Sequence, residues 1–175
     1  MIGKILLAYD GSNNARRALD LAAELSCKLE ADLSIVHVLM HGRPSKELVR
    51  MAEAEHIVDQ AQNTFSPSVA YAPGQMYSLL KDSGTTDQGA RIIPAIGDQL
   101  AAFAKSRSEE LGAQNVTTSV RSGDYADEIL KTAKKQKADM IVIGSRGLGK
   151  IREAVLGSVS QKVLHHAAQT VVTVK

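Results

Sequence analysis

The stretch IVIGSRGLGKIREAVLGSV, residues 141–159, passes from an apolar run through a glycine-rich loop into a helical pattern. Its first three residues are β-branched, which favours a short buried strand. Beyond the glycines, Val155, Val159 and Val163 recur at helical spacing. A strand, a glycine turn and a helix in direct succession are typical of one βα unit of a parallel sheet.

The same alternation extends along the chain. Runs rich in Val, Ile and Leu predict five strands, at residues 5–9, 33–38, 116–120, 140–143 and 170–174. Helical patterns separate these runs, at 18–29 behind Ser12, 96–111, 126–133 behind Asp124, and 155–167. We therefore predict an α/β fold, an open doubly wound parallel sheet of five strands in the order 3-2-1-4-5 with helices on both faces. Such sheets bind ligands beyond the carboxyl ends of the strands where the winding reverses, so the loops at Asp10 and Gly144 are the candidates.

One segment does not fit the alternation. We predict a single domain, 1–175, with a flexible insertion at about 41–95 that is rich in turn-forming residues yet contains Phe65, Tyr71 and Tyr77. It is either a solvated surface insertion or a lid or partner-binding arm.

Composition excludes several classes of function. The chain has 21 basic and 19 acidic residues, no tryptophan and 3% aromatic residues, so neither a basic surface nor stacking platforms for nucleic acid are expected. No run approaches the length of a membrane span, and no signal peptide is recognised. The single cysteine, Cys27, lies on an apolar helical pattern and is expected to be a buried, inert thiol. These features predict a cytoplasmic protein that binds neither nucleic acid nor membrane.

The loop after the fourth strand has the features of a phosphate site. Glycines at 144, 147 and 149 allow a ligand to approach the backbone, and Arg146, Lys150 and Arg152 add positive charge. The alternative is that a βα turn simply favours glycine. A Walker A loop is excluded, because Ile151 stands where that motif needs a hydroxyl group for Mg²⁺.

A further glycine extends the loop pattern. Gly157 and Ser158 complete the spacing G144-x2-G147-x9-G157-S158. A glycine inside a helix costs about 1 kcal/mol relative to alanine, so we expect the helix to begin near Ser158 instead. Ser158 would then cap the helix and contact phosphate.

This spacing resembles the universal stress protein family, specifically its ATP-binding members, whose motif is G-x2-G-x9-G-[ST]. The resemblance covers nearly all of the chain except residues 41–95, through KILLAYDGS, SIVHV, SGDYADEIL, ADMIVIGSRGLGK and LGSVSQKVLHHA. The chain departs from the family in lacking a proline just before the last strand, where Gln169 and Thr170 stand, and in its longer insertion.

The resemblance implies ATP, with Mg²⁺, as the ligand, and it implies the residues that hold it. Asp10 would face adenine and ribose, although a turn-forming role beside Gly11 is the alternative. The remaining implied contacts are Val38 to adenine by its main chain, Ile143 and Gly144 to the nucleoside, Gly147 to ribose and phosphate, and Gly157, Ser158 and Val159 to the phosphates.

We expect a nucleotide-dependent binding protein in stress response rather than an efficient enzyme, since no base for water attack and no catalytic or metal-binding set is recognised. His165 and His166 are neighbours on a helix, point about 100° apart, and fit a helix C-terminus better than a metal site. Slow ATP hydrolysis or autophosphorylation is compatible with this interpretation. The alternatives are an ATP-consuming enzyme on the same fold, or a family member that binds AMP, a cyclic nucleotide or no nucleotide.

The last predicted strand, 170–174, is apolar and lies at the edge of the sheet, where its unpaired backbone groups can pair with a second copy. This position and the family resemblance together predict a homodimer through 170–174.

Overall fold

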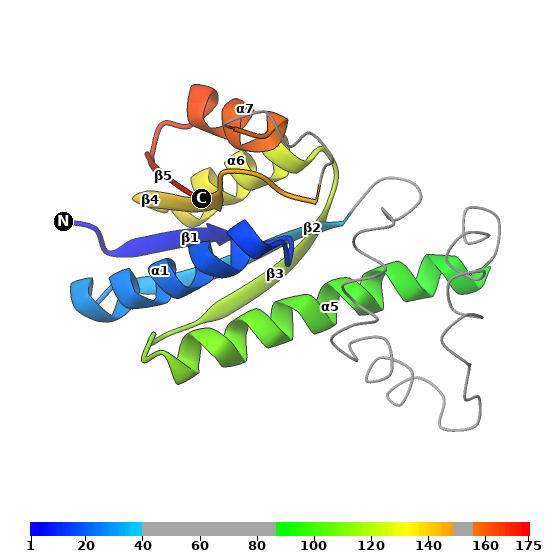
Figure 1. Ribbon diagram of the computed structural model, residues 1–175, viewed down its shortest axis with the longest axis horizontal. Helices are drawn as coiled ribbons and strands as arrows, with labels where there is room; N and C mark the ends of the chain where they lie inside the picture. The colour runs from blue at the N-terminus through cyan, green and yellow to red at the C-terminus, as the bar shows by residue number, and fades with distance from the viewer. Residues whose placement is uncertain (40–86, 149–155) are drawn as a thin grey trace.

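The computed structural model describes residues 1–39, 87–148 and 156–175, and side chains of the long central helix from Gly97 onward. Five strands alternate with four helices along the described chain (Figure 1), as the sequence predicts. The elements are β1 (Lys4–Ala8), α1 (Asn13–Leu29), β2 (Asp32–Leu39), α5 (Asp87–Glu110), β3 (Thr117–Ser122), α6 (Tyr125–Gln136), β4 (Met140–Gly144), α7 (Ser158–His166) and β5 (Thr170–Val174).

The strands form one parallel sheet in the order β3-β2-β1-β4-β5, which confirms the predicted fold class and topology. Ile5 of β1 pairs with Leu33 of β2 on one side and with Met140 of β4 on the other. The chain winds outward from β1 to β2 and β3, then returns to add β4 and β5 on the opposite side of β1. The winding direction therefore reverses between β1 and β4.

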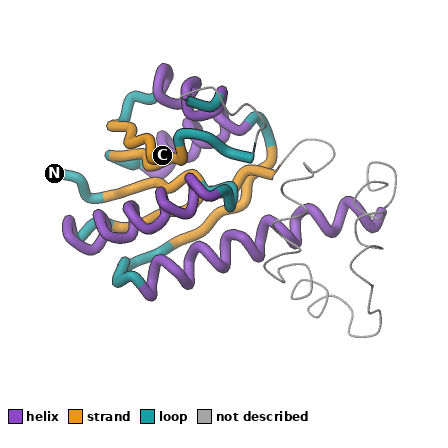
Figure 2. Tube along the Cα trace, in the orientation of Figure 1, coloured by secondary structure: helices purple, strands orange, loops and turns teal. Residues whose placement is uncertain are grey.

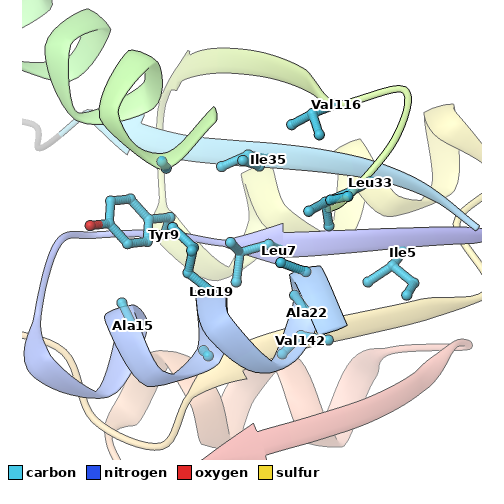
Figure 3. Packing of buried hydrophobic residues seen from close by; sticks show 14 of the residues in the cluster. Ile5, Leu7, Tyr9, Ala15, Leu19, Ala22, Leu33, Ile35, Val116 and Val142 are labelled. Atoms are coloured by element: carbon cyan, nitrogen blue, oxygen red, sulfur yellow. The ribbon is translucent and has the colours of Figure 1, made fainter. Parts of the chain in front are cut away.

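α1 and α5 cover one face of the sheet, and α6 and α7 cover the other (Figure 2). Alternate strand residues point to opposite faces, so β1, β2, β4 and β5 each contribute to two separate apolar clusters. The first cluster packs β-strand residues against α1 and α5, and includes Ile5, Leu7, Tyr9, Leu19 and Leu33 (Figure 3). The second lies under α6 and α7, and includes Leu6, Ala8, Val36, Val38, Ala126, Ile129, Ile141, Ile143 and Val163. Burial of the central strands on both faces explains their nearly continuous apolar sequences.

The predicted caps of α1 and α6 are confirmed. Ser12 accepts a hydrogen bond from the backbone N–H of Ala15, at 3.2 Å, and Asp124 accepts one from the N–H of Asp127, at 3.1 Å. Each bond satisfies a donor that has no partner within the first turn of its helix.

The prediction for the long central helix was wrong at its start. α5 begins at Asp87 rather than near residue 96, so residues 87–95, which the sequence analysis placed in the insertion, are helical. Proline lacks a backbone donor, yet one missing hydrogen bond does not end this helix, which continues on both sides of Pro94. Residues 41–86, which carry the rest of the predicted insertion, lie outside the described residues.

The prediction for Cys27 was also wrong. Its thiol is exposed near the end of α1 rather than buried. The neighbouring Ser26 takes the buried position and donates a hydrogen bond from its hydroxyl to the carbonyl of Ala31, at 2.6 Å. A polar group can occupy the apolar face of a helix when its hydrogen bond is satisfied, which the spacing of apolar residues does not reveal.

Candidate functional site

The loops after β1 and β4 meet at the point where the winding of the sheet reverses. β1 and β4 are neighbouring strands, so their loops begin side by side. The loop after β1 leads to α1 on one face of the sheet, and the loop after β4 leads toward α7 on the other face. Asp10 lies in the first loop and Gly147 in the second. The Oδ2 atom of Asp10 occupies the space that a Cβ atom on Gly147 would need. The structure thus brings together two of the predicted site residues.

Hydrogen bonds hold the Asp10 loop in place. Oδ1 of Asp10 accepts a bond from the backbone N–H of Ser12 at 3.0 Å, which is the turn-forming role considered for this residue. Ser12 also donates from its hydroxyl to the carbonyl of Arg146 at 3.4 Å, and so connects the two loops. Asp10 therefore has a structural role that leaves Oδ2 directed at Gly147.

Gly144 has a packing role of its own. A Cβ atom on this glycine would lie 2.9 Å from the backbone nitrogen of Ala15 and 3.0 Å from the carbonyl carbon of Asn14. Backbone atoms in the first turn of α1 cannot move aside as a flexible side chain would. The glycine at 144 is therefore required by the close approach of α1 to β4, with or without a ligand.

The helix that follows the glycine loop begins where the motif predicts, but with a different cap. α7 starts at Ser158, and Gly157 is its N-cap residue, with extended backbone angles of φ −76° and ψ 160°. The prediction that Ser158 caps the helix was wrong, because Ser158 is already the first helical residue and its side chain is exposed. Among the described residues, no side chain provides a cap hydrogen bond to α7 at Gly157, in contrast to Ser12 of α1 and Asp124 of α6. Its first turn can present backbone N–H groups to an anion.

A buried serine that the sequence analysis missed anchors this region. Ser145 is fully buried, and its carbonyl accepts bonds from the N–H of Gly157, at 2.7 Å, and from the hydroxyl of Ser160, at 2.7 Å. Its own N–H donates to the carbonyl of Val174 at 2.6 Å, and its hydroxyl accepts from the Asn14 amide at 2.9 Å. Ser145 thus connects α7, β5 and α1. A serine in a glycine-rich loop is typical of a turn, so the sequence carries no signal for this role.

Three predicted contacts lie on the face covered by α6 and α7. Val38 and Ile143 belong to the second apolar cluster, and Val159 packs against it from the first turn of α7. Val38 and Ile143 are in the last two residues of β2 and β4. The carboxyl edge of the sheet is therefore apolar beside Asp10 and the glycine loop.

The opposite face of this edge carries two buried titratable side chains. The Nδ1–H of His37 donates to the carbonyl of Tyr9 at 2.9 Å, and burial lowers the pKa of His37. Burial also raises the pKa of Tyr9 to about 12. The Tyr9 ring extends past the end of β1 (Figure 3), and its hydroxyl has no hydrogen-bond partner among the residues that the structure describes. Both groups are held neutral near pH 7.

Several other predictions concern charge and metals. His165 and His166 lie in the last turn of α7, as predicted for cations near a helix C-terminus. Within the described ranges, no cluster of His, Cys, Asp or Glu side chains could hold a metal ion by itself. In the same part of the chain, no helix is both long and apolar enough to cross a bilayer. Gly149, Lys150 and Arg152 lie outside the described residues.

Comparison with known proteins agrees with the fold and with the motif. The profile of the Universal stress protein family matches residues 1–175. Universal stress protein YxiE of Bacillus subtilis is 33% identical over 163 residues, which cover 93% of this chain and 92% of YxiE. The structure of universal stress protein UspA from Lactobacillus plantarum is 18% identical, with a TM-score of 0.68 and coverage of 99% of this chain and 98% of that one. The universal stress protein from Archaeoglobus fulgidus in complex with dAMP is 21% identical, with a TM-score of 0.59 and coverage of 100% and 98%. The chain described here belongs to the universal stress protein family.

Proposed function

We propose that this chain binds ATP, with Mg²⁺, at the carboxyl edge of its sheet and acts in stress response through nucleotide-dependent interactions in the cytoplasm. The observation that supports this proposal best is the contact of Asp10 with Gly147 beside the uncapped first turn of α7. A carboxylate suits the ribose hydroxyl groups as an acceptor, and exposed N–H groups at a helix N-terminus suit phosphate. The dAMP bound by the Archaeoglobus fulgidus relative is an adenine nucleotide of the same class.

Each predicted residue then has a specific task. Val38 and Ile143 offer an apolar surface to the nucleoside, while Gly144 keeps α1 close to the end of β4. Gly157, Ser158 and Val159 form the start of α7 and would contact the phosphates through N–H groups and the Ser158 hydroxyl.

Mg²⁺ fits this arrangement as a partner of the nucleotide rather than of the protein. It retains several waters and is commonly held by substrate phosphates with one or two protein groups. A site without a metal-binding cluster among the described residues suits that mode of binding. When bound, Mg²⁺ would offset phosphate charge, and the exposed hydroxyl of Ser158 is the group at the start of α7 that would face it.

The same proposal includes a homodimer through β5. It also holds that the chain is not an efficient enzyme. β5 lies at one edge of the sheet and pairs only with β4 among the described strands, so its outer backbone groups can pair with a second copy. A protein partner at the insertion stays a prediction from the sequence.

Isothermal titration of the purified chain with Mg·ATP, AMP, cyclic AMP and adenosine tests the nucleotide proposal. We expect saturable binding in which ATP binds more tightly than adenosine, because only ATP reaches the start of α7. Steady-state turnover of ATP at rates typical of enzymes would favour the ATP-consuming alternative, and tighter binding of AMP or cyclic AMP would reassign the ligand. Absence of binding to all four compounds would exclude the proposed function.

A further inference from the structure

An aromatic side chain stands at the same edge of the sheet and has no role in the motif. Tyr125 is the first residue of α6, directly after the Asp124 cap, and it follows β3 at the carboxyl edge. The chain contains only four tyrosines and two phenylalanines. Among the aromatic rings that the structure describes, Tyr9 is buried on the opposite face and Phe103 is exposed on α5. Tyr125 is half-buried.

Tyr125 packs against the apolar cluster to which two of the predicted nucleoside contacts belong. It lies against the apolar cluster that contains Val38 and Ile143, and Val159 of α7 packs against the same cluster. The pKa of Tyr125 is raised by burial and, to a smaller extent, by the negative charge of Asp10. Three parts of the candidate site, from β2, β4 and α7, thus share one apolar surface with this ring.

Ion pairs connect the start of α6, which carries the ring, to α7. Lys162 of α7 lies 3.1 Å from Oδ1 of Asp124, the N-cap of α6, and 2.8 Å from Oδ1 of Asp127 in its first turn. These contacts connect the start of α6 to the second turn of α7. Each pair is exposed and contributes little stability by itself, but together they restrict how the two helix starts can move apart.

We infer that Tyr125 is a specificity-determining residue whose ring forms one wall of the nucleoside pocket and stacks on the adenine base, an inference that rests on the proposed function. A planar base is bound well by an aromatic face, which supplies dispersion and excludes water from one side of the ring. The aliphatic side chains of Val38 and Ile143 would contact the base on its remaining apolar surface. The phenol hydroxyl is not required for stacking, so the ring itself carries the effect.

Binding measurements with adenosine and ATP separate a base contact from a phosphate contact. Replacement of the ring in Tyr125→Ala should raise the Kd for both ligands by the same factor, about 5- to 100-fold for a stacked base. Tyr125→Phe should bind both ligands as the wild type does. Gly157→Asn, in contrast, should weaken ATP and leave adenosine unchanged, because it alters only the start of α7.

Leu130→Ala is the matched control. Leu130 lies on α6, packs against the same apolar cluster, and is five residues further along the helix, about 7.5 Å from Tyr125 along the axis. Its truncation should lower the melting temperature as Tyr125→Ala does, while the Kd for adenosine stays unchanged. A role limited to core packing predicts that both variants behave alike.

Tyrosine fluorescence gives a second readout. It can be measured directly because the chain has no tryptophan whose emission would mask it. Adenosine should quench part of the wild-type emission, and this quenching should disappear in Tyr125→Phe although binding persists. If the wild type binds adenosine and Tyr125→Ala binds it equally well, the inference fails and the proposed function stands. If the wild type binds no adenine compound, the proposed function fails first. A loss of affinity for ATP without any loss for adenosine would also overturn the stacking role.

Discussion

Oδ2 of Asp10 fills the space beside Gly147 where any other residue would place its Cβ atom. The carboxylate has little freedom to move away, because its Oδ1 accepts a hydrogen bond from Ser12 at 3.0 Å. The end of β1 and the glycine loop after β4 therefore constrain each other. A change in either residue alters the shape of the proposed ribose site.

The first prediction follows from that contact. Gly147→Ala should displace the Asp10 carboxylate, weaken ATP binding and reduce the free energy of unfolding. In an Asp10→Ala background the same substitution should cost little stability, since the clashing oxygen is gone. Denaturant melts of the two single variants and the double variant give the coupling energy, expected at about 0.5–3 kcal/mol for residues in direct contact. Additive effects would show that the two residues do not constrain each other.

The second prediction contrasts two glycines of the motif. Gly144→Ala should lower the free energy of unfolding by about 1–3 kcal/mol, as overpacking against backbone does. Gly157→Asn should keep or raise stability, because a Cβ on Gly157 would meet no atom of the described residues nearer than 3.5 Å and asparagine is a favoured N-cap. Its side chain would accept from the N–H groups that we assign to phosphate, so affinity for ATP should fall. A stable Gly157→Asn protein with wild-type affinity would contradict the phosphate assignment.

The third prediction separates anchoring from ligand contact in α7. The Ser160 hydroxyl lies 2.7 Å from the carbonyl of Ser145 and 2.9 Å from that of Gly157, and shares its proton between them. Ser160→Ala should therefore cost about 1 kcal/mol of stability, the typical loss for one hydrogen bond. Ser158→Ala should leave the thermal melt unchanged and weaken ATP binding, because this hydroxyl is exposed at the helix start. Equal effects of both variants on stability would refute the distinction.

The fourth prediction concerns the loss of folding stability at acidic pH. Burial lowers the pKa of His37 below its ordinary value of 6.5, against smaller opposing effects of Tyr9, Asp10 and Asp98. The unfolded chain then binds a proton that the folded chain does not, so stability should fall as pH drops below 6.5 toward the folded pKa. One proton gives a slope of at most about 1.4 kcal/mol per pH unit. Urea melts between pH 8 and pH 5 should show a shallower decline for His37→Gln than for the wild type. Parallel curves would exclude His37 as the source.

The fifth prediction tests the proposed dimer with two proline variants. Thr170 donates its N–H to Asp139, and Val174 accepts from Ser145, so alternate residues of β5 face β4 and Val172 is one of them. The N–H groups of Val171 and Thr173 point outward. Thr173→Pro should leave a folded chain with weakened dimerisation, whereas Val172→Pro should disrupt the sheet within one copy. Light scattering and thermal melts measure both effects, and a wild-type monomer at micromolar concentration would reject this interface.

The sequence by itself determined the fold class, because each element carries a local signal. Short, nearly continuous apolar runs indicate the strands, a period of 3.6 indicates α1 and α6, and Ser12 and Asp124 mark where these helices begin. The glycine spacing also located the loop after β4 and the start of α7 at Ser158. Boundaries depend on longer-range contacts, and α5 accordingly begins nine residues before the predicted position.

Only the tertiary structure decided what the site residues do to one another. Asp10 and Gly147 are far apart in sequence, and their contact depends on β1 and β4 being adjacent in the sheet. The same adjacency gives Gly144 its packing role against α1 and makes Ser145 an anchor for α7 and β5. Periodicity placed Cys27 on the apolar side of its helix, yet the hydrogen bond of Ser26 to Ala31 puts serine in the buried position. Local sequence patterns predict the conformation of a segment. Burial and contacts depend instead on which segments pack together, because side-chain packing and hydrogen bonding act between residues distant in the chain.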